Sequence, residues 1–136
     1  MSETNAATGK FTTLTPELLK GSMARVEGVA TVATVNEDNT PNAGIFVTMM
    51  PDEDHVSMVL APNRTRSNIE RTKTCVVTYT VMDASASQKA DRYKGARLKL
   101  ELVTPQDEGY QELCNRTPRF NPYTLLFRIV DYMQIG

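Results

Sequence analysis

A cluster of arginine, hydroxyl and amide side chains stands at the predicted start of a short helix, in residues 63–71. This segment reads NRTRSNIER and follows an apolar strand predicted for residues 56–60. Helix N-termini carry unpaired N–H groups and a positive dipole end, so they attract anions. Arginine adds a planar set of donors that suits phosphate, and hydroxyls and amides add shorter-range donors. We therefore interpret residues 63–71, called the clamp below, as a phosphate-binding segment.

The clamp also has a structural interpretation, in which Arg64, Arg66 and Arg71 form a solvated helix face with Glu70 as an ion-pair partner. From the segment alone, the two interpretations are equally good. Two observations favour phosphate. Cations are unfavourable at a helix N-terminus unless an anion joins them, and the preceding strand brings this helix end to a sheet edge or barrel mouth, a common ligand position. The sequence has no GxxxxGK[ST] or GxGxxG motif, which disfavours an ATPase and a Rossmann dehydrogenase.

The composition fits one globular domain without a strong charge. The chain has 136 residues, with 15 Lys and Arg against 16 Asp and Glu, for a net charge of −1. This balance argues against a general nucleic-acid binder, which is usually basic. It also means that an anion site must depend on local charges rather than on long-range steering.

The side chains that most often bind metals or attack substrates are few. Cys75 and Cys114 lie far apart in the sequence, and Cys75 falls within a predicted apolar strand, which indicates a small buried side chain. The only histidine, His55, follows an acidic turn and has no nucleophile motif near it. We therefore predict no metal site, and no catalytic residue is identified.

No apolar run approaches the roughly 18 residues that span a membrane. The polar residues 1–10 lack the apolar core of a signal peptide. We expect a cytoplasmic protein without a membrane partner.

The patterns predict strands, short turns and three helices. Residues 1–14 are expected to be flexible, and residues 15–136 to form a single domain. Helices are predicted from residue 15 to the Gly28 stop, from the clamp onward, and over residues 105–115. A polar loop is predicted over residues 83–95. Strands are predicted at residues 29–35, 42–50, 56–60, 75–81, 96–102 and 125–135.

These elements indicate a mainly β protein with inserted helices. Short turns join the first three strands, so a doubly wound parallel sheet is disfavoured. We predict a six-stranded antiparallel β-barrel, closed or nearly closed.

The order of elements resembles the pyridoxamine 5′-phosphate oxidase-like FMN-binding split barrels. The hairpin sequence VATVATVNEDNTPN, residues 29–42, is similar to that family's strand-turn-strand motif, with Asn39 in place of the usual glycine. Asparagine tolerates a positive φ, so this departure is mild. The clamp sequence NRTRSNI is similar to the family's helix start. The resemblance covers roughly residues 15–135 and implies a split β-barrel of the FMN-binding type.

The resemblance also implies where FMN would bind. Arg64, Thr65 and Asn68 would hold the phosphate, assisted by Arg66 or Ser67. Residues on either side of the isoalloxazine ring, and aromatic residues from the partner chain of a homodimer, complete the implied site: Phe46, Val47, Thr48, Met49, Leu60, Ala61, Pro62, Phe120 and Tyr123. For the aromatic residues Phe46, Phe120 and Tyr123, packing in the core or in an interface is the more common role.

The implied function is that of an FMN-binding oxidoreductase with an unidentified substrate. The chain lacks the arginine-rich C-terminal segment of true pyridoxamine 5′-phosphate oxidases, which argues against that activity. Two alternatives stay open. One is a non-catalytic split barrel that binds flavin, transfers electrons, or binds haem or a deazaflavin. The other is an interaction domain in which the clamp is an ordinary charged helix.

Overall fold

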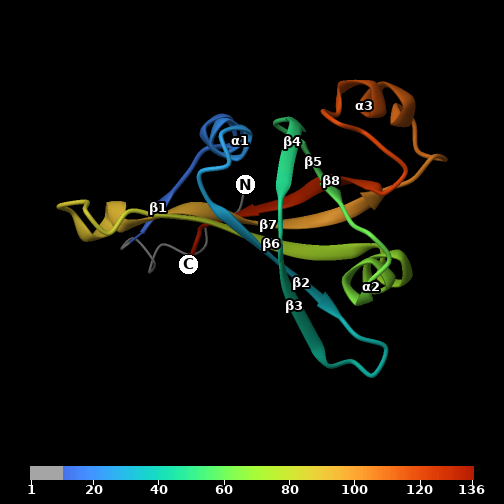
Figure 1. The fold of residues 1–136 in the computed structure, drawn as a ribbon, viewed down its shortest axis with the longest axis horizontal. Coiled ribbons are helices and arrows are strands. Elements are labelled where there is room, and N and C mark those ends of the chain that lie inside the picture. Colours follow the sequence, from blue (N-terminus) through green and yellow to red (C-terminus); the bar gives the residue numbers. More distant parts are fainter. Residues whose placement is uncertain (1–10) are drawn as a thin grey trace.

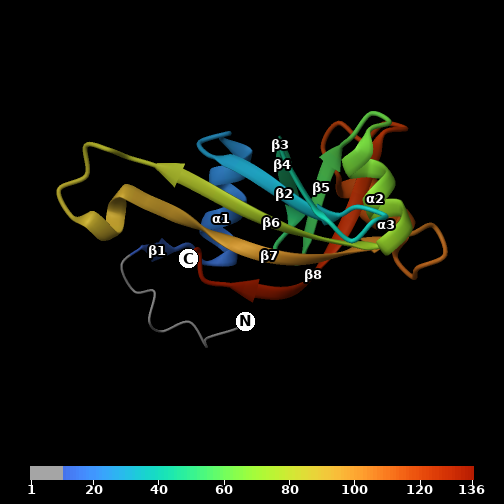
Figure 2. The same cartoon turned by 90° about the horizontal axis from the view of Figure 1, so that it is seen from below.

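The computed structural model describes residues 11–136, which form one strongly curved sheet with three α-helices around it (Figure 1, Figure 2). The strands are β1 (Thr12–Thr13), β2 (Val29–Val35), β3 (Pro41–Phe46), β4 (Thr48–Asp52), β5 (His55–Val59), β6 (Thr74–Met82), β7 (Tyr93–Val103) and β8 (Thr124–Met133). The helices are α1 (Pro16–Ala24), α2 (Arg64–Thr72), α3 (Tyr110–Arg116) and the 3-10 helix η2 (Lys89–Arg92). The prediction of a mainly β split barrel is confirmed.

The sheet is antiparallel along its main path, with strand order β3-β2-β6-β7-β8-β5-β4. The two-residue β1 adds a parallel pairing with β7. The end strands, β3 and β4, are consecutive in the chain and are separated by Val47 alone. Figure 1 shows them as one long ribbon that crosses the curved sheet. The chain itself therefore joins the two edges of the sheet, which gives the split barrel its shape.

The predicted single strand over residues 42–50 is wrong, and with it the count of six strands. β3 pairs with β2 through Ala30 and Phe46, whereas β4 pairs with β5 through Thr48 and Met58. The strand leaves one partner and joins another at Val47, whose side chain is 64% exposed. Apolar residues continue across this point in the sequence. The change of partner strand leaves no signal in the sequence. Alternation of apolar and polar residues shows which face of the sheet a side chain lies on, but not which strand lies beside it.

The β2–β3 hairpin alternates between a buried face and an exposed one. Along β2, Ala30, Val32 and Thr34 are buried while the residues between them are exposed. Asn39 in the connecting turn has φ 67, which confirms that it takes the left-handed conformation expected at this position. The hairpin therefore offers one face to the core and the other to solvent or a partner.

The core fills the inside of the curved sheet and is closed by two helices. Val32, Val56, Leu98 and Phe127, which come from four different strands, are fully buried. Helix α1 adds Leu19 and Met23, and helix α2 adds Ile69. Because the clamp helix places an apolar side chain in this core, its position relative to the sheet is fixed by burial.

The third helix begins later than predicted. Residues 105–115 were expected to be helical, but α3 starts at Tyr110. Thr104 and Asp107 form a turn instead: Thr104 N donates to Asp107 Oδ2 at 2.7 Å, and Asp107 N donates to Thr104 O at 2.9 Å. A Thr-x-x-Asp pattern is compatible with a helix cap and with a turn, because the side-chain oxygen can accept a hydrogen bond from a backbone N–H in both conformations.

The predictions for residues 1–14 and for the loop over residues 83–95 can be compared with the structure only in part. The expected flexibility of residues 1–14 concerns mainly residues 1–10, which lie outside the described residues; Thr12 and Thr13 pair with β7. The predicted loop over residues 83–95 is interrupted by η2 and ends at Tyr93, where β7 begins. Among the described residues, no helix is both long and apolar enough to cross a membrane.

Candidate functional site

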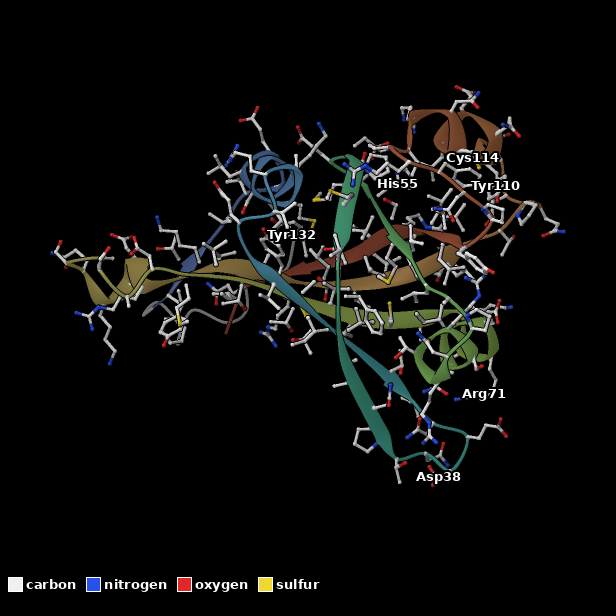
Figure 3. The ribbon with its side chains drawn as sticks, viewed as in Figure 1. Asp38, His55, Arg71, Tyr110, Cys114 and Tyr132 are labelled. Atoms are coloured by element: carbon white, nitrogen blue, oxygen red, sulfur yellow. The ribbon has the colours of Figure 1, made fainter. Side chains whose placement is uncertain are left out.

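The clamp forms the predicted helix, and Asn63 caps it. Asn63 is extended, with φ −157, and its Oδ1 accepts a hydrogen bond from Arg66 N at 2.8 Å. Lys73 ends the helix with φ 66. Helix α2 lies beside the turn between β2 and β3, so that Arg71 and Asp38 appear near each other at one end of the molecule (Figure 3).

An open hollow of about 400 Å³ lies between α2 and that turn. The helix contributes Arg64, Ser67 and Asn68, and the turn contributes three polar residues: Asn36, Glu37 and Asp38. The Arg64 and Ser67 side chains are exposed. Three of the five predicted phosphate-binding residues therefore line one hollow, together with turn residues that the sequence analysis did not select.

Two of the clamp's three arginines bind the protein's own backbone. Arg66 Nη1 donates to the carbonyl oxygens of Leu60 at 2.6 Å and Tyr123 at 3.0 Å. Arg71 donates to Asn68 Oδ1 at 3.0 Å and also to the carbonyl oxygen of Val35. The Arg64 side chain takes part in none of the side-chain hydrogen bonds or ion pairs of the described residues. Among the described residues, Arg64 is thus the one clamp arginine whose guanidinium has no hydrogen-bond or ion-pair partner.

Asn68 and Thr65 belong to a buried polar network that ties the helix to the hairpin. Asn68 Nδ2 donates to Thr34 Oγ1 at 3.0 Å and to Asn36 Oδ1 at 2.9 Å. Asn42 Nδ2 donates to Thr34 Oγ1 and to Thr65 Oγ1, both at 3.2 Å. Asn68 and Thr65 are 3% and 5% exposed. Asn68 Nδ2 and Thr65 Oγ1 have their partners in the hairpin, so both residues already serve to position the clamp.

The turn is held in shape by Asp38. Its Oδ1 accepts from the Thr40 hydroxyl at 2.5 Å and from Thr40 N at 3.1 Å. These hydrogen bonds lower the pKa of the Asp38 carboxyl, and the positive charge of Arg64 lowers it further by a smaller amount. Asp38 is therefore a fixed negative charge on the wall opposite Arg64.

An apolar pocket of about 200 Å³ lies at the other end of β3. Its lining includes Phe46, Val47 and Thr48, three of the seven residues of this chain predicted beside the ring, and none of the lining side chains is charged. Val47 is exposed, whereas the buried Thr48 hydroxyl points inward and donates to Met23 Sδ at 3.5 Å. Met49 is half-buried on β4.

Tyr79 forms the polar floor of this pocket, and sequence reasoning missed it. Its hydroxyl lies 2.9 Å from Ser22 Oγ and accepts from Gly28 N at 2.9 Å. A Cβ atom at Gly28 would lie 2.5 Å from the Thr80 carbonyl oxygen, so only glycine allows this close approach. Within β6, Tyr79 shows only the alternation of an ordinary strand, and no sequence signal separates it from a core residue.

The remaining predicted residues lie next to the clamp. Leu60 is buried, whereas Ala61 and Pro62 are exposed just before the helix. Phe120 and Tyr123 are 41% and 51% exposed, and the Tyr123 backbone contacts Arg66. The loop with these two aromatic residues thus lies beside the clamp of its own chain. Their predicted approach to a partner's ring stays a prediction.

The histidine lies elsewhere, beside α3, and Figure 3 shows His55 and Arg71 on different parts of the molecule. His55 Nδ1 lies 2.8 Å from Asp52 Oδ1, and Arg116 Nη2 donates to Asp52 Oδ2 at 2.9 Å. No cluster of His, Cys, Asp or Glu suited to a metal ion occurs among residues 11–136. Burial raises the pKa of the Cys75 thiol to about 12, as expected for a packing residue rather than a nucleophile.

No family model and no curated protein matches the chain. Solved structures do. An FMN-binding protein from Syntrophomonas wolfei is 21% identical, with a TM-score of 0.61 over 90% of this chain and 88% of that one. A candidate pyridoxamine 5′-phosphate oxidase from Lactobacillus delbrueckii is 14% identical, with a TM-score of 0.56 over 84% and 89%. The haem storage protein of Vibrio cholerae is 15% identical, with a TM-score of 0.56 over 88% and 92%.

At these identities the likeness concerns the fold. The chain therefore has the split-barrel fold of the pyridoxamine 5′-phosphate oxidase-like FMN-binding proteins.

Proposed function

We propose that the protein binds FMN and acts as an FMN-dependent oxidoreductase. One observation carries this proposal: the hollow at the clamp and the apolar pocket lie at opposite ends of the same strand, β3. From Asn42 to Phe46 the strand rises about 13 Å. A hollow with the exposed Arg64 for a phosphate and an uncharged pocket for a ring are thus separated along one strand, as a flavin mononucleotide requires.

In this proposal Arg64 and Ser67 bind the phosphate with the first N–H groups of α2. Phe46, Val47 and the adjacent backbone line the ring, while Ala61 and Pro62 lie beside the phosphate, just before the clamp helix. Bound FMN would supply the redox chemistry, and the protein would orient the ring and set its surroundings. No side chain needs to act as a general acid or base for this role.

Haem is the less favoured ligand, although one similar structure is a haem storage protein. Histidine is a common axial ligand of haem iron. The only histidine of the chain is held by Asp52 next to α3, away from the clamp and from the apolar pocket. We therefore favour a flavin.

We also propose that the protein is a homodimer through the outer face of β2 and β3. This face exposes Val29, Val35, Ile45 and Val47, each at least 45% exposed. Exposed apolar side chains gathered on adjacent strands usually mark an interface. Light scattering should give twice the mass of the chain, and Ile45→Lys should shift it to the monomer. A wild-type monomer at micromolar concentration would reject the dimer.

The flavin proposal is tested by titrating FMN and riboflavin into the purified protein and following flavin fluorescence. Arg64→Ala should weaken FMN about tenfold, because a charge-assisted hydrogen bond contributes about 1.5 kcal/mol, and should leave riboflavin unchanged. Arg128→Ala is the matched control, since it removes an exposed arginine that pairs with Glu101 on another part of the sheet. Absence of FMN binding at tens of micromolar would reject the proposal. Steady oxidation of a reduced nicotinamide by the loaded protein would establish turnover.

A further inference from the structure

The hollow beside the clamp contains more negative than positive charge from the side chains that line it. Within residues 11–136, Arg64 is the only cation that lines it, whereas Glu37 and Asp38 are both acidic. Arg66 and Arg71 are directed to backbone carbonyl oxygens and add no donor to the lining. A site built only to maximise phosphate affinity would not place a carboxylate opposite its free arginine.

The carboxylate of Asp38 is fixed relative to helix α2 by a chain of hydrogen bonds. Asp38 accepts from Thr40, Thr40 accepts from Asn36 Nδ2 at 3.1 Å, and Asn36 accepts from Asn68. The turn is closed as well by Asn36 N donating to Thr40 O at 2.9 Å. Glu37 forms none of the side-chain hydrogen bonds seen in the described residues. The Asp38 side chain is therefore held at the hollow by hydrogen bonds, whereas the Glu37 side chain has none of these.

We infer that Asp38 is a specificity-determining residue, which opposes Arg64 and weakens the binding of phosphate in the hollow. The inference rests on the proposed function, in which the hollow takes the FMN phosphate. A phosphate at Arg64 lies in the field of a carboxylate on the facing wall. The free energy gained from the arginine is then partly offset, so the protein discriminates less between phosphorylated and unphosphorylated flavins than its clamp sequence suggests.

Asp38→Asn tests the inference with little risk to the fold. Asparagine keeps the Oδ1 atom that accepts from Thr40, and it removes the charge. The FMN dissociation constant should fall about threefold to fivefold, the effect of one exposed charge pair, while the riboflavin constant stays unchanged. Asp54→Asn is the matched control: it changes the net charge equally in the exposed β4–β5 turn, and it should change neither constant.

Two results would overturn the inference. Unchanged FMN affinity would mean that the carboxylate does not act on the phosphate. Weaker binding of both flavins would mean instead that Asp38 accepts a hydrogen bond from the flavin's hydroxyl chain.

A second arm separates this inference from the flavin proposal. Inorganic phosphate is titrated while the backbone amide resonances of Arg64 and Ser67 are followed by NMR. Tighter phosphate binding by Asp38→Asn than by the wild type would support the inference even if neither protein bound a flavin. Amide resonances that do not move in either protein would overturn it.

Discussion

The Asn68 side-chain amide donates to Thr34 Oγ1 at 3.0 Å and so joins helix α2 to strand β2 across 34 residues of sequence. Both side chains are buried. Asn68 also donates to Asn36 and accepts from Arg71, so one amide satisfies partners on two elements. A residue that the family resemblance assigns to phosphate binding is thus also the main polar link between the clamp and the hairpin.

Asn68→Ala should lower the free energy of unfolding by about 1–3 kcal/mol, since it leaves buried polar groups without partners. Urea unfolding followed by circular dichroism measures this change. Ser67→Ala, one position earlier and exposed, should change stability by less than about 0.5 kcal/mol. Equal stability of the two variants would contradict the structural role of Asn68.

Arg66 is expected to matter for stability rather than for ligand charge. Its guanidinium joins the ends of β5 and β8 through the carbonyl oxygens of Leu60 and Tyr123. Arg66→Ala should cost about 1–2 kcal/mol of unfolding free energy. Lysine cannot reproduce two donor directions from a planar group, so Arg66→Lys should recover only part of the loss.

Arg64→Ala is the matched comparison for Arg66 in the same unfolding experiment. We expect a stability change below about 0.5 kcal/mol for this exposed side chain. If Arg64→Ala proved more destabilising than Arg66→Ala, the assignment of a structural role to Arg66 and a ligand-binding role to Arg64 would be wrong.

The different roles of the three clamp arginines could not have been predicted from the sequence. The helix start, the Asn39 turn and the barrel class follow from local signals: a capping residue, a left-handed position and alternating apolar residues. The partners of Arg66 and Arg71 are backbone carbonyl groups, which carry no sequence signal. The three arginines look equivalent along the helix and differ only once β5 and β8 are in place.

The same limit explains the missed half of the site. Asn36 and Asp38 fit ordinary turn chemistry, which accounts for their presence without a ligand. Their approach to Arg64 depends on how the curved sheet brings the β2–β3 turn to α2. A local pattern that is already explained by a turn gives no reason to suspect a second role.

A substitution at Gly28, where the chain approaches β6 closely, tests the packing around Tyr79 in the apolar pocket. Gly28→Ala would place Cβ 2.5 Å from the Thr80 carbonyl oxygen and 2.8 Å from Tyr79 Cζ, which forces the backbone apart. We expect a loss of about 1–3 kcal/mol in unfolding free energy, together with altered tyrosine fluorescence.

Gly21 in helix α1 provides the opposite expectation. A Cβ there would meet only the far end of the Arg25 side chain, at 3.2 Å. Gly21→Ala should therefore stabilise the protein by about 0.5–1 kcal/mol through helix propensity. If both Gly21→Ala and Gly28→Ala were destabilising, the short contacts of a Cβ atom at Gly28 would not explain the loss of stability in Gly28→Ala.

The acid stability of the protein should depend on Asp52, which connects the β4–β5 hairpin to α3. Burial alone would raise the pKa of this carboxyl. Hydrogen bonds from His55, from the Asp54 N–H and from Arg116 outweigh that effect and lower the pKa. The folded protein thus binds the Asp52 proton less readily than the unfolded chain does. The stability contributed by Asp52 is therefore present above the ordinary Asp pKa of about 3.9 and disappears as the pH falls below it.

Asp52→Asn should accordingly be less stable than the wild type at pH 7, and the gap should narrow as the pH falls through the acid range. Unfolding free energies at pH 7, 5, 4 and 3 measure it. Asp54→Asn, which changes an exposed carboxyl of the same turn, should show a small and constant difference. The sign is decisive: a group with a lowered pKa stabilises only where it is ionised, so a gap that widened toward acid would mean that the hydrogen bonds to Asp52 do not outweigh its burial.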